Sequence, residues 1–388
     1  MLNRGYSFCD MIDELKIALV HDDLTQYGGA ERVLQVMHEI WPDAPIYTSI
    51  YDREVMLKKG WNDEGMNIIS SSFQWLPNKA KFANKFYLPI YPIAFESFDF
   101  SEFDVVISSS SRFAHGIITR PETVHISYCN SPARFLWMYN DYEREHGRIK
   151  SWQKIFLFPI LNWQRMWDQL ASERVDFYIG NSNTIEERIK KIYRRDSEVI
   201  FPPVDVESFI PESNVKKENY YIIVSRLAGH KRVDLAVKAF NELGHEYNLK
   251  IIGAGDKREE LKAMAKGNIE FLGFVSDEER NSLVQSAKAF LYPQFEDFGI
   301  TAVEANAAGT PLIGYGKGGL LDTMIEGKTA VFFDEQTPEA IIRAIHKFEK
   351  MKFDSGDCIE NAKNFSEEKF KKKLKEYVEE KWKNAFRQ

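Results

Sequence analysis

Short apolar runs alternate with amphipathic stretches along most of the chain. In its second half the runs read YYIIVS, NLKIIG, IEFLG, KAFLYP, TPLIGYG and TAVFF. The stretches between them, such as RVDLAVKAFNELG and SDEERNSLVQSA, are typical of helices. This alternation predicts parallel βαβ units and therefore a doubly wound α/β sheet.

The first half of the chain shows the same alternation with more interruptions. Its apolar runs are LKIALV, APIYTSI, FDVVISS, TVHISY and VDFYIGN, and GGAERVLQVMHEI follows the first of them as a helix. Between the halves, Pro202 and Pro203 cannot continue a helix or a central strand. We therefore expect a Rossmann-like domain at 1–202, a second at 203–365, and a final helix at 366–388 that packs back onto the first. The carboxyl ends of both sets of strands would face a shared cleft.

The composition is that of a globular protein. Of 388 residues, 44% are hydrophobic and 28% are charged, and no run approaches the roughly 18 apolar residues that a membrane helix needs. The three cysteines, Cys9, Cys129 and Cys358, are far apart, which favours a reducing compartment over a disulfide framework or a zinc site. The net charge of -7 argues against nucleic-acid binding. We expect a cytoplasmic protein.

The stretch EDFGITAVE follows a predicted buried strand and opens a predicted helix. Asp297 is expected to cap this helix, and Gly309 with Pro311 to end it. Its first free N–H groups would belong to Phe298, Gly299, Ile300 and Thr301. A helix N-terminus that contains a glycine is a suitable site for a phosphate.

Two glutamates flank this predicted phosphate site. Glu296 lies ahead of it and Glu304 about one turn into the helix. Carboxylates accept hydrogen bonds from hydroxyl groups and repel phosphate, so a ligand with a central diphosphate and hydroxyl-bearing rings on either side would fit. A nucleotide sugar has this layout. The alternative is that both glutamates are solvated helix charges.

Two further turns favour a diphosphate ligand. Arg226 and Lys231 follow a predicted strand, where two cations can neutralise the charge that develops on a leaving diphosphate. Gly28 and Gly29 open the first helix of the other domain and permit close backbone approach to a phosphate. Both pairs have a simpler interpretation, as surface cations and as a tight turn. The GAG fragment at 253–255 is interpreted as a turn.

Over most of its length the chain resembles the retaining glycosyltransferase family 4, whose fold is the two-domain GT-B arrangement. The stretches that carry the resemblance are GGAE (28–31), GNSNTIEERIKKIY (180–193), VIFPPVD (199–205), SRLAGHKRVDLAV (225–237) and EDFGITAVEANAAGTPLIGYGKGG (296–319). The segment YCNSPARFLW (128–137) is most similar to bacterial mannosyltransferases of polysaccharide and lipopolysaccharide assembly.

The resemblance implies a role for each candidate residue. Arg226 and Lys231 would hold the donor diphosphate, together with the backbone of Phe298, Gly299, Ile300 and Thr301. Glu304 would bind the ribose and Glu296 the transferred hexose, while Phe274 and Val275 would line the nucleobase site. Gly28 and Gly29 would close on the donor, and Arg134 would lie on the acceptor side. The family needs no metal or other cofactor and transfers with retention, the departing phosphate helping to deprotonate the acceptor.

One position departs from the family pattern. Relatives carry a histidine beside the reacting sugar, where this chain has Asn130. Asparagine can donate and accept hydrogen bonds but cannot titrate. We therefore expect Asn130 to act in catalysis by hydrogen bonding, or else to signal a sugar-nucleotide-binding protein without turnover. His115 and His125 lie near in sequence, and each is expected to be structural.

Two stretches, 73–95 and 148–167, mix basic residues with Trp, Phe and Leu. They fit either a membrane interface at the inner face of the membrane or an acceptor site packed within the protein. The leading hypothesis is a retaining hexosyltransferase that moves mannose from GDP-mannose to a lipid-linked or saccharide acceptor in cell-surface glycan synthesis. The alternatives are a UDP-sugar-dependent transferase, a sugar-nucleotide epimerase of the same fold, or the binding protein without turnover.

Overall fold

The computed structural model describes residues 15–76, 87–146, 150–213 and 215–385. The chain forms two compact units, one made of Met1–Pro203 with Phe370–Gln388 and the other of Val204–Lys369. The sequence pattern had placed the division between residues 202 and 203.

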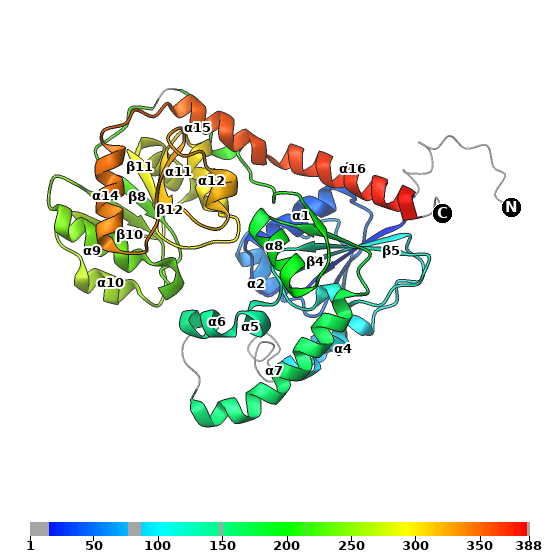
Figure 1. Ribbon diagram of the computed structural model, residues 1–388. Coiled ribbons are helices and arrows are strands. Elements are labelled where there is room, and N and C mark those ends of the chain that lie inside the picture. The colour runs from blue at the N-terminus through cyan, green and yellow to red at the C-terminus, as the bar shows by residue number, and fades with distance from the viewer. Residues whose placement is uncertain (1–14, 77–86, 147–149, 214, 386–388) are drawn as a thin grey trace. The chain divides into compact units, whose positions relative to one another are not determined.

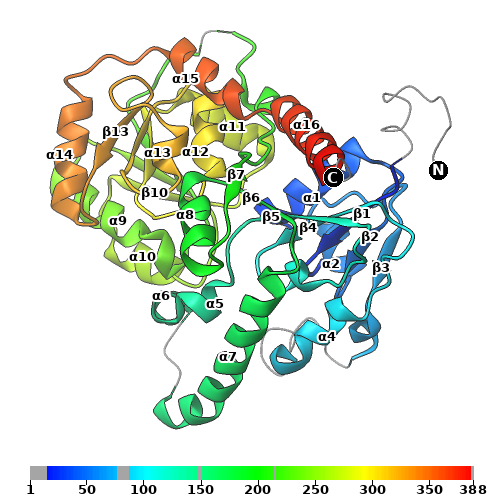
Figure 2. The same cartoon turned by 45° about the vertical axis from the view of Figure 1, so that its right-hand side comes forward.

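A seven-stranded parallel sheet forms the centre of the first unit, in the order β3-β2-β1-β4-β5-β6-β7 (Figure 2). Its strands are β1 (Ile17–His21), β2 (Ile46–Thr48), β3 (Ile68–Ser70), β4 (Val105–Ser110), β5 (Val124–Cys129), β6 (Phe177–Gly180) and β7 (Ser197–Val199). The apolar runs predicted five of these. The pattern missed β3 and β7, because each is a three-residue edge strand that is only half-buried and so has no apolar run.

Helices cover both faces of this sheet. They are α1 (Gly29–Ile40), α2 (Arg53–Lys58), α4 (Tyr91–Glu96), α5 (Arg134–Trp137), α6 (Tyr139–His146), α7 (Ser151–Ser172) and α8 (Asn183–Ile192). Local capping explains where several of them begin. For example, the Ser182 side chain accepts a hydrogen bond from the N–H of Ile185 at the start of α8.

A six-stranded parallel sheet forms the centre of the second unit, in the order β10-β9-β8-β11-β12-β13 (Figure 1). Its strands are β8 (Tyr221–Val224), β9 (Leu249–Ile252), β10 (Ile269–Gly273), β11 (Ala289–Tyr292), β12 (Leu312–Tyr315) and β13 (Ala330–Phe333). Its helices are α9 (Val233–Leu243), α10 (Arg258–Met264), α11 (Asp277–Ser286), α12 (Ile300–Ala307), α13 (Leu320–Thr323), α14 (Pro338–Phe348) and α15 (Ser355–Ala362). All six strands coincide with predicted apolar runs.

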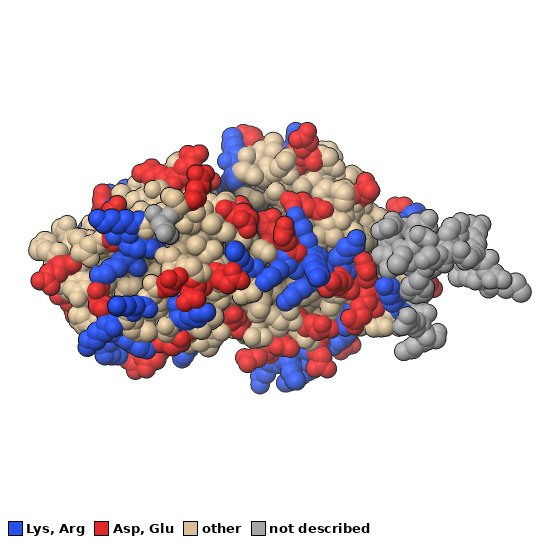
Figure 3. Space-filling view, turned by 90° about the horizontal axis from the view of Figure 1, so that it is seen from above, with Lys and Arg blue, Asp and Glu red and all other residues tan. Residues whose placement is uncertain are grey.

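The final helix, α16 (Glu367–Ala385), packs on the first unit. Its buried side chains Phe370, Leu374, Tyr377 and Val378 belong to the core cluster that covers one face of the first sheet. Lys371 and Lys381 of this helix form ion pairs with Glu39 and Glu198. Figure 3 shows basic and acidic side chains intermixed on the face seen from above.

The two sheets share one strand order. In each, the chain builds outward from the first strand and then returns to its other side, so the order reverses between β1 and β4 and again between β8 and β11. Such switch points leave a crevice outside the carboxyl ends of the strands, where open α/β sheets bind ligands. The doubly wound α/β architecture expected from the sequence is confirmed in both units. The loops after these four strands therefore define where to look for a site.

Candidate active site

The loop after β8 carries two of the predicted donor cations. Arg226 is exposed two residues beyond the strand, and Lys231 ends a single turn of 3-10 helix, Gly229–Lys231. Arg232 follows with φ 51° and serves as the N-cap of α9. A left-handed non-glycine residue costs backbone energy and often marks a functional loop. The sequence gave no signal for this conformation of Arg232.

A second glycine loop braces the segment that carries Arg226. Gly253 and Gly255 follow β9, and a Cβ on either would lie under 3.0 Å from the carbonyl oxygen of Ser225 or Leu227. The N–H of Leu227 donates to the carbonyl of Ala254 at 2.9 Å. These glycines do form a turn, as interpreted, but close backbone packing is what requires them.

The loop after β11 reaches α12 with a different geometry from the one expected. The N-cap is Gly299, at φ 96°, and α12 begins at Ile300, so the prediction that Asp297 caps the helix is wrong. The left-handed turn brings Gly299 against the buried ring of Tyr292, whose hydroxyl would lie 3.1 Å from a Cβ at this position. The N–H groups of Ile300 and Thr301 lie in the first turn of α12, where no intrahelical carbonyl can accept from them.

Glu296 and Lys231, which were assigned to different parts of the donor, contact each other directly. The Lys231 ammonium donates to the Glu296 carboxylate, and both side chains are partly exposed. Glu304 lies in α12, also partly buried. Burial raises the pKa of Tyr292, and the charges of Glu296 and Glu304 add to the rise, which places both carboxylates around one buried phenol.

Two glycines after β12 were not assigned a role from the sequence. The N–H of Gly319 donates to the carbonyl of Glu296 at 2.9 Å. A Cβ at Gly318 would lie under 3.0 Å from the Glu296 carbonyl oxygen, and one at Gly319 under 3.0 Å from Phe298. These glycines therefore fix the position of Glu296 and Phe298. The signal was the KGG sequence that follows a strand, a pattern typical of close backbone approach.

The predicted nucleobase residues follow the edge strand β10. Gly273 turns the chain at φ 74°, after which Phe274 is 92% exposed and Val275 is partly buried. A fully exposed phenylalanine ring can stack on a flat ligand. The structure thus brings Arg226, Lys231, Glu296, the start of α12 and Phe274 to the carboxyl edge of one sheet.

In the first unit, the glycine pair is less accessible than predicted. Gly28 is the N-cap of α1, and its N–H donates to the Glu31 side chain at 2.8 Å. Glu31 is itself buried and lies 3.8 Å from the Nε2 atom of His21. Gly29 is exposed at the first position of the helix. The Gly28 amide is therefore already used within the chain.

The switch point of the first unit holds an acidic pair that sequence reasoning missed. The buried carboxylate of Asp22 accepts hydrogen bonds from four consecutive N–H groups, those of residues 111–114, at 2.6 to 3.0 Å. Asp23 pairs with Arg112 and accepts from the Thr25 hydroxyl at 2.6 Å. The sequence feature that could have indicated this pair is HDD, directly after the first predicted strand. These contacts fasten the loop after β4 to the loop after β1.

Asn130 and Arg134 lie on the segment from β5 to α5. The side-chain amide of Asn130 donates to the Ser109 hydroxyl at 3.0 Å, and its backbone N–H donates to Ser110 at 2.8 Å. Its carbonyl accepts from Asn181 at 2.9 Å. Asn130 is partly exposed, and Arg134 is the first residue of α5. Asn130 is thus held firmly at the sheet edge.

His115 and His125 are both buried. The Nε2 atom of His125 contacts the Ser108 hydroxyl at 2.9 Å, and burial, with the nearby His115, lowers the pKa of His125 to about 3. The Nε2 atom of His115 lies 3.4 Å from Asp168, whose carboxyl pKa is raised by burial. Neither imidazole reaches solvent, so each is structural in this fold.

The aromatic stretches divide between core and surface. Phe73, Tyr91 and Phe95 pack in the core of the first unit. Among the described residues, seven of the sixteen exposed large apolar side chains lie on α7, namely Trp152, Ile155, Phe156, Phe158, Trp163, Met166 and Leu170. Residues 77–86 and 148–149 of these stretches lie outside the described part of the chain. Within the described part, no helix has the length and hydropathy to cross a membrane.

In the described residues, no group of three or more His, Cys, Asp or Glu side chains is arranged to hold a metal ion. Arg226 and Lys231 are two cations that the described residues offer at this edge.

Residues 205–365 match the model of the family described as glycosyl transferases group 1. The second unit is a glycosyltransferase group 1 domain. Its curated relatives include the O-antigen chain mannosyltransferase RfbU of Salmonella typhimurium, 32% identical over 155 residues, which cover 37% of this chain and 43% of RfbU. The alpha-1,3/1,6-mannosyltransferase ALG2 of Mus musculus is 24% identical over 93% of this chain and 95% of ALG2. The chain spans less than half the length of some relatives that it matches, RfbU among them.

Solved structures share the architecture beyond the group 1 domain. HepE of Anabaena, in complex with UDP, superimposes with a TM-score of 0.68 over 94% of this chain and 99% of HepE, at 15% identity. At that identity the likeness shows the fold alone, and the fold is GT-B. The group 1 match, the mannosyltransferase relatives and the GT-B fold together confirm the resemblance to glycosyltransferase family 4 that the motifs indicated.

Proposed function

We propose that the chain is a retaining glycosyltransferase that moves mannose from GDP-mannose to a lipid-linked or saccharide acceptor in cell-surface glycan synthesis. One observation carries the proposal. Arg226, Lys231 and the first turn of α12 lie on the two sides of the switch point of a glycosyltransferase group 1 domain. Cations and a helix N-terminus at this place suit a diphosphate that leaves with developing negative charge.

In this mechanism the protein uses charge in place of a metal ion. Arg226 contacts the diphosphate from the loop after β8, and the N–H groups of Ile300 and Thr301 contact it from α12. Lys231 exchanges its bond with Glu296 for one with the phosphate, which frees the Glu296 carboxylate to accept from a hydroxyl of the hexose. Glu304 accepts from the ribose. The departing phosphate oxygen takes the acceptor proton on the same face of the sugar. Activity should survive a strong chelator.

The acceptor side is assigned to Asn130 and Arg134. Asn130 can offer a hydrogen bond to the sugar or the acceptor but no proton transfer. If the wild-type protein binds nucleotide sugars and transfers nothing, the chain is a sugar-nucleotide-binding protein instead.

A UDP-sugar is the second candidate donor. The structural neighbour HepE binds UDP, and the exposed Phe274 ring can stack on uracil as well as on guanine. Mannose from GDP-mannose is preferred because RfbU and ALG2 are mannosyltransferases.

We further propose that α7 docks the protein on the inner face of the membrane. Trp152, Ile155 and Phe156 are each more than half exposed near its first turns, and Lys150 is exposed just before them. Apolar and basic residues together favour the headgroup region of a bilayer. A lipid-linked acceptor would lie in that same surface. Sedimentation with anionic vesicles, compared between the wild type and Phe156→Ser, tests this arrangement.

A thermal-shift panel of GDP-, UDP- and ADP-sugars identifies the donor. A ligand at about 100 times its dissociation constant stabilises the folded state by roughly 2.7 kcal/mol. Product analysis then separates enzyme from binder. Glu304→Gln should weaken the nucleotide sugar and the bare nucleotide alike, because both contain the ribose, whereas Glu296→Gln should mainly reduce turnover. If Glu296→Gln weakened nucleotide binding and Glu304→Gln mainly reduced turnover, the ribose and hexose roles given to these two glutamates would be wrong.

A further inference from the structure

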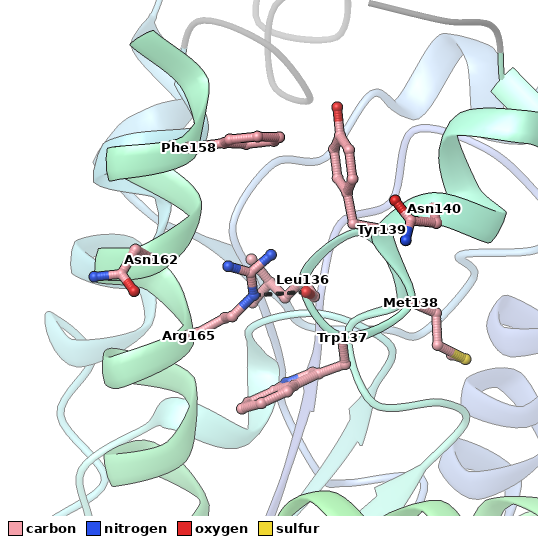
Figure 4. A pocket seen from close by; sticks show the side chains of 8 residues that line it. All are labelled: Leu136, Trp137, Met138, Tyr139, Asn140, Phe158, Asn162 and Arg165. Atoms are coloured by element: carbon pink, nitrogen blue, oxygen red, sulfur yellow. Dashed lines mark hydrogen bonds between the residues drawn. The ribbon is translucent and has the colours of Figure 1, made fainter. Parts of the chain in front are cut away.

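The first unit contains a cavity that none of the assigned residues line. It has a volume of about 750 Å³ and lies between α5, α6 and α7 (Figure 4). Residues 136–140 form one wall, and Phe158, Asn162 and Arg165 of α7 form the other. Sites for small ligands typically enclose about 300 to 1,000 Å³. The cavity begins two residues after Arg134, on the segment that carries the acceptor-side motif.

Aromatic side chains from both walls contact each other and are held in place. The rings of Tyr139 and Phe158 meet edge to face, with centroids 5.5 Å apart. Lys154 lies over the Tyr139 ring at 5.8 Å and pairs with Glu143 at 2.7 Å. Trp137, at the base, donates from its indole N–H to the buried Asp168 at 2.7 Å. A ligand would therefore meet a preformed apolar surface.

Arg165 is the charged residue among those that line the cavity. Its Nε atom donates to the carbonyl of Leu136 at 2.7 Å, the bond drawn as a dashed line in Figure 4, and this bond orients the guanidinium group. Among the residues that the structure describes, no carboxylate pairs with it. Other arginines of this unit do pair with carboxylates: Arg53 with Asp63, Arg112 with Asp23, and Arg174 with Glu96.

A partly buried guanidinium with an oriented fork and no counter-ion fits a planar or tetrahedral anion that it can bind through two parallel hydrogen bonds. The aromatic residues of the lining fit the apolar face of a sugar ring, and the side-chain amide of Asn140 fits a hydroxyl group.

We propose that this cavity is an acceptor subsite for an anionic sugar, with Arg165 binding its phosphate or carboxylate group. The inference rests on the proposed transferase function and gives the acceptor its chemical class. A phosphate would come from the linkage of a sugar to a lipid carrier or from a soluble sugar phosphate, and a carboxylate from a uronic acid in a saccharide.

The test is a calorimetric titration of the full-length protein with three probes, α-D-mannose 1-phosphate, methyl α-D-glucuronide and methyl α-D-mannoside. At least one charged probe should bind about 10-fold more tightly than the neutral mannoside. The tighter of the two charged probes identifies the source of the anion. Arg165→Gln should abolish the preference, and Arg226→Ala, on the other unit, should leave it intact.

A second variant changes an exposed residue, so that a loss of binding cannot be explained by misfolding of the protein. Asn162→Asp should weaken the charged probe by several-fold and leave the neutral one unchanged, because it sets a carboxylate near the anion. Asn67→Asp, an equally exposed change in the same unit, should have no effect. The proposal fails if charged and neutral probes bind alike, if Arg165→Gln or Asn162→Asp keeps the preference, or if Arg226→Ala removes it. Titration with nucleoside diphosphates distinguishes failure of this subsite proposal from failure of the proposed transferase function. If the proposed function were wrong, no nucleoside diphosphate would bind.

Discussion

The two switch points of this molecule have the same backbone plan and opposite electrostatics. In the second unit, between β8 and β11, Arg226 is exposed and Lys231 shares a partly exposed ion pair with Glu296. In the first unit, between β1 and β4, Asp22 is buried and accepts from four N–H groups. Charge left at the surface is available to a ligand, whereas charge satisfied inside the chain stabilises the fold. The charges of one crevice are therefore open to a ligand, whereas those of the other hold its own loops together.

The largest effect should come from removing the buried carboxylate. Asp22→Ala leaves the N–H groups of residues 111–114 without their acceptor, and we expect the first unit to lose about 4 kcal/mol of unfolding free energy. All eight tryptophans lie in this unit, so tryptophan fluorescence during urea unfolding reports on it selectively. The exposed Asp43→Ala is the matched control and should change little. Equal midpoints for the two variants would mean that Asp22 does not hold the loop.

Acid should affect the first unit through His125. Its folded pKa of about 3 is far below the usual 6.5, so the unfolded chain binds the proton more readily and stability falls as the pH drops below 6.5. Between pH 6.5 and 5 this amounts to about 2 kcal/mol. In His125→Gln this part of the pH dependence should disappear from the tryptophan-detected transition. The exposed His245→Gln should retain it. A slope unchanged by His125→Gln would assign the acid sensitivity to other groups.

The sequence predicted most strands of this fold and the positions of two cations after one of them, for a physical reason. The strands of the second unit are largely apolar, with Lys250 and Glu270 as exceptions, so all six could be identified from the sequence. The exposed cations Arg226 and Lys231 follow such a strand and so could be located. The features that could not be predicted from the sequence depend on contacts between distant parts of the chain or on backbone conformation. The left-handed Arg232, the Gly299 cap and the four bonds to Asp22 each require residues that are distant in sequence or a backbone conformation that residue type does not specify.

Charge at the open crevice should control the affinity for a bare nucleoside diphosphate. Arg226→Ala and Lys231→Ala should each weaken binding by about 2 kcal/mol, roughly 30-fold, because a phosphate charge loses its partner. Glu296→Gln should act in the opposite direction and tighten binding by up to about 1 kcal/mol, because Lys231 no longer has a competing carboxylate. Calorimetric titration measures all three. If Glu296→Gln weakened the diphosphate, the exchange of Lys231 between Glu296 and phosphate would be wrong.

The smallest effect is expected at Asn130, whose side chain is partly exposed and partly used for hydrogen bonds within the protein. Its amide already donates to Ser109, so only part of its hydrogen-bonding capacity remains for a sugar or an acceptor. Asn130→Ala should therefore slow transfer by about 1 kcal/mol, roughly 5-fold, with the affinity for the nucleotide unchanged because that site lies on the other unit. Asn130→Asp should slow transfer more, because a carboxylate there would repel the diphosphate. Single-turnover rates at saturating donor measure both. If Asn130→Ala left transfer untouched, the residue would be structural, like His115 and His125. If the wild type transferred nothing and Asn130→His created activity, the chain would be a binding protein that lacks its titratable group.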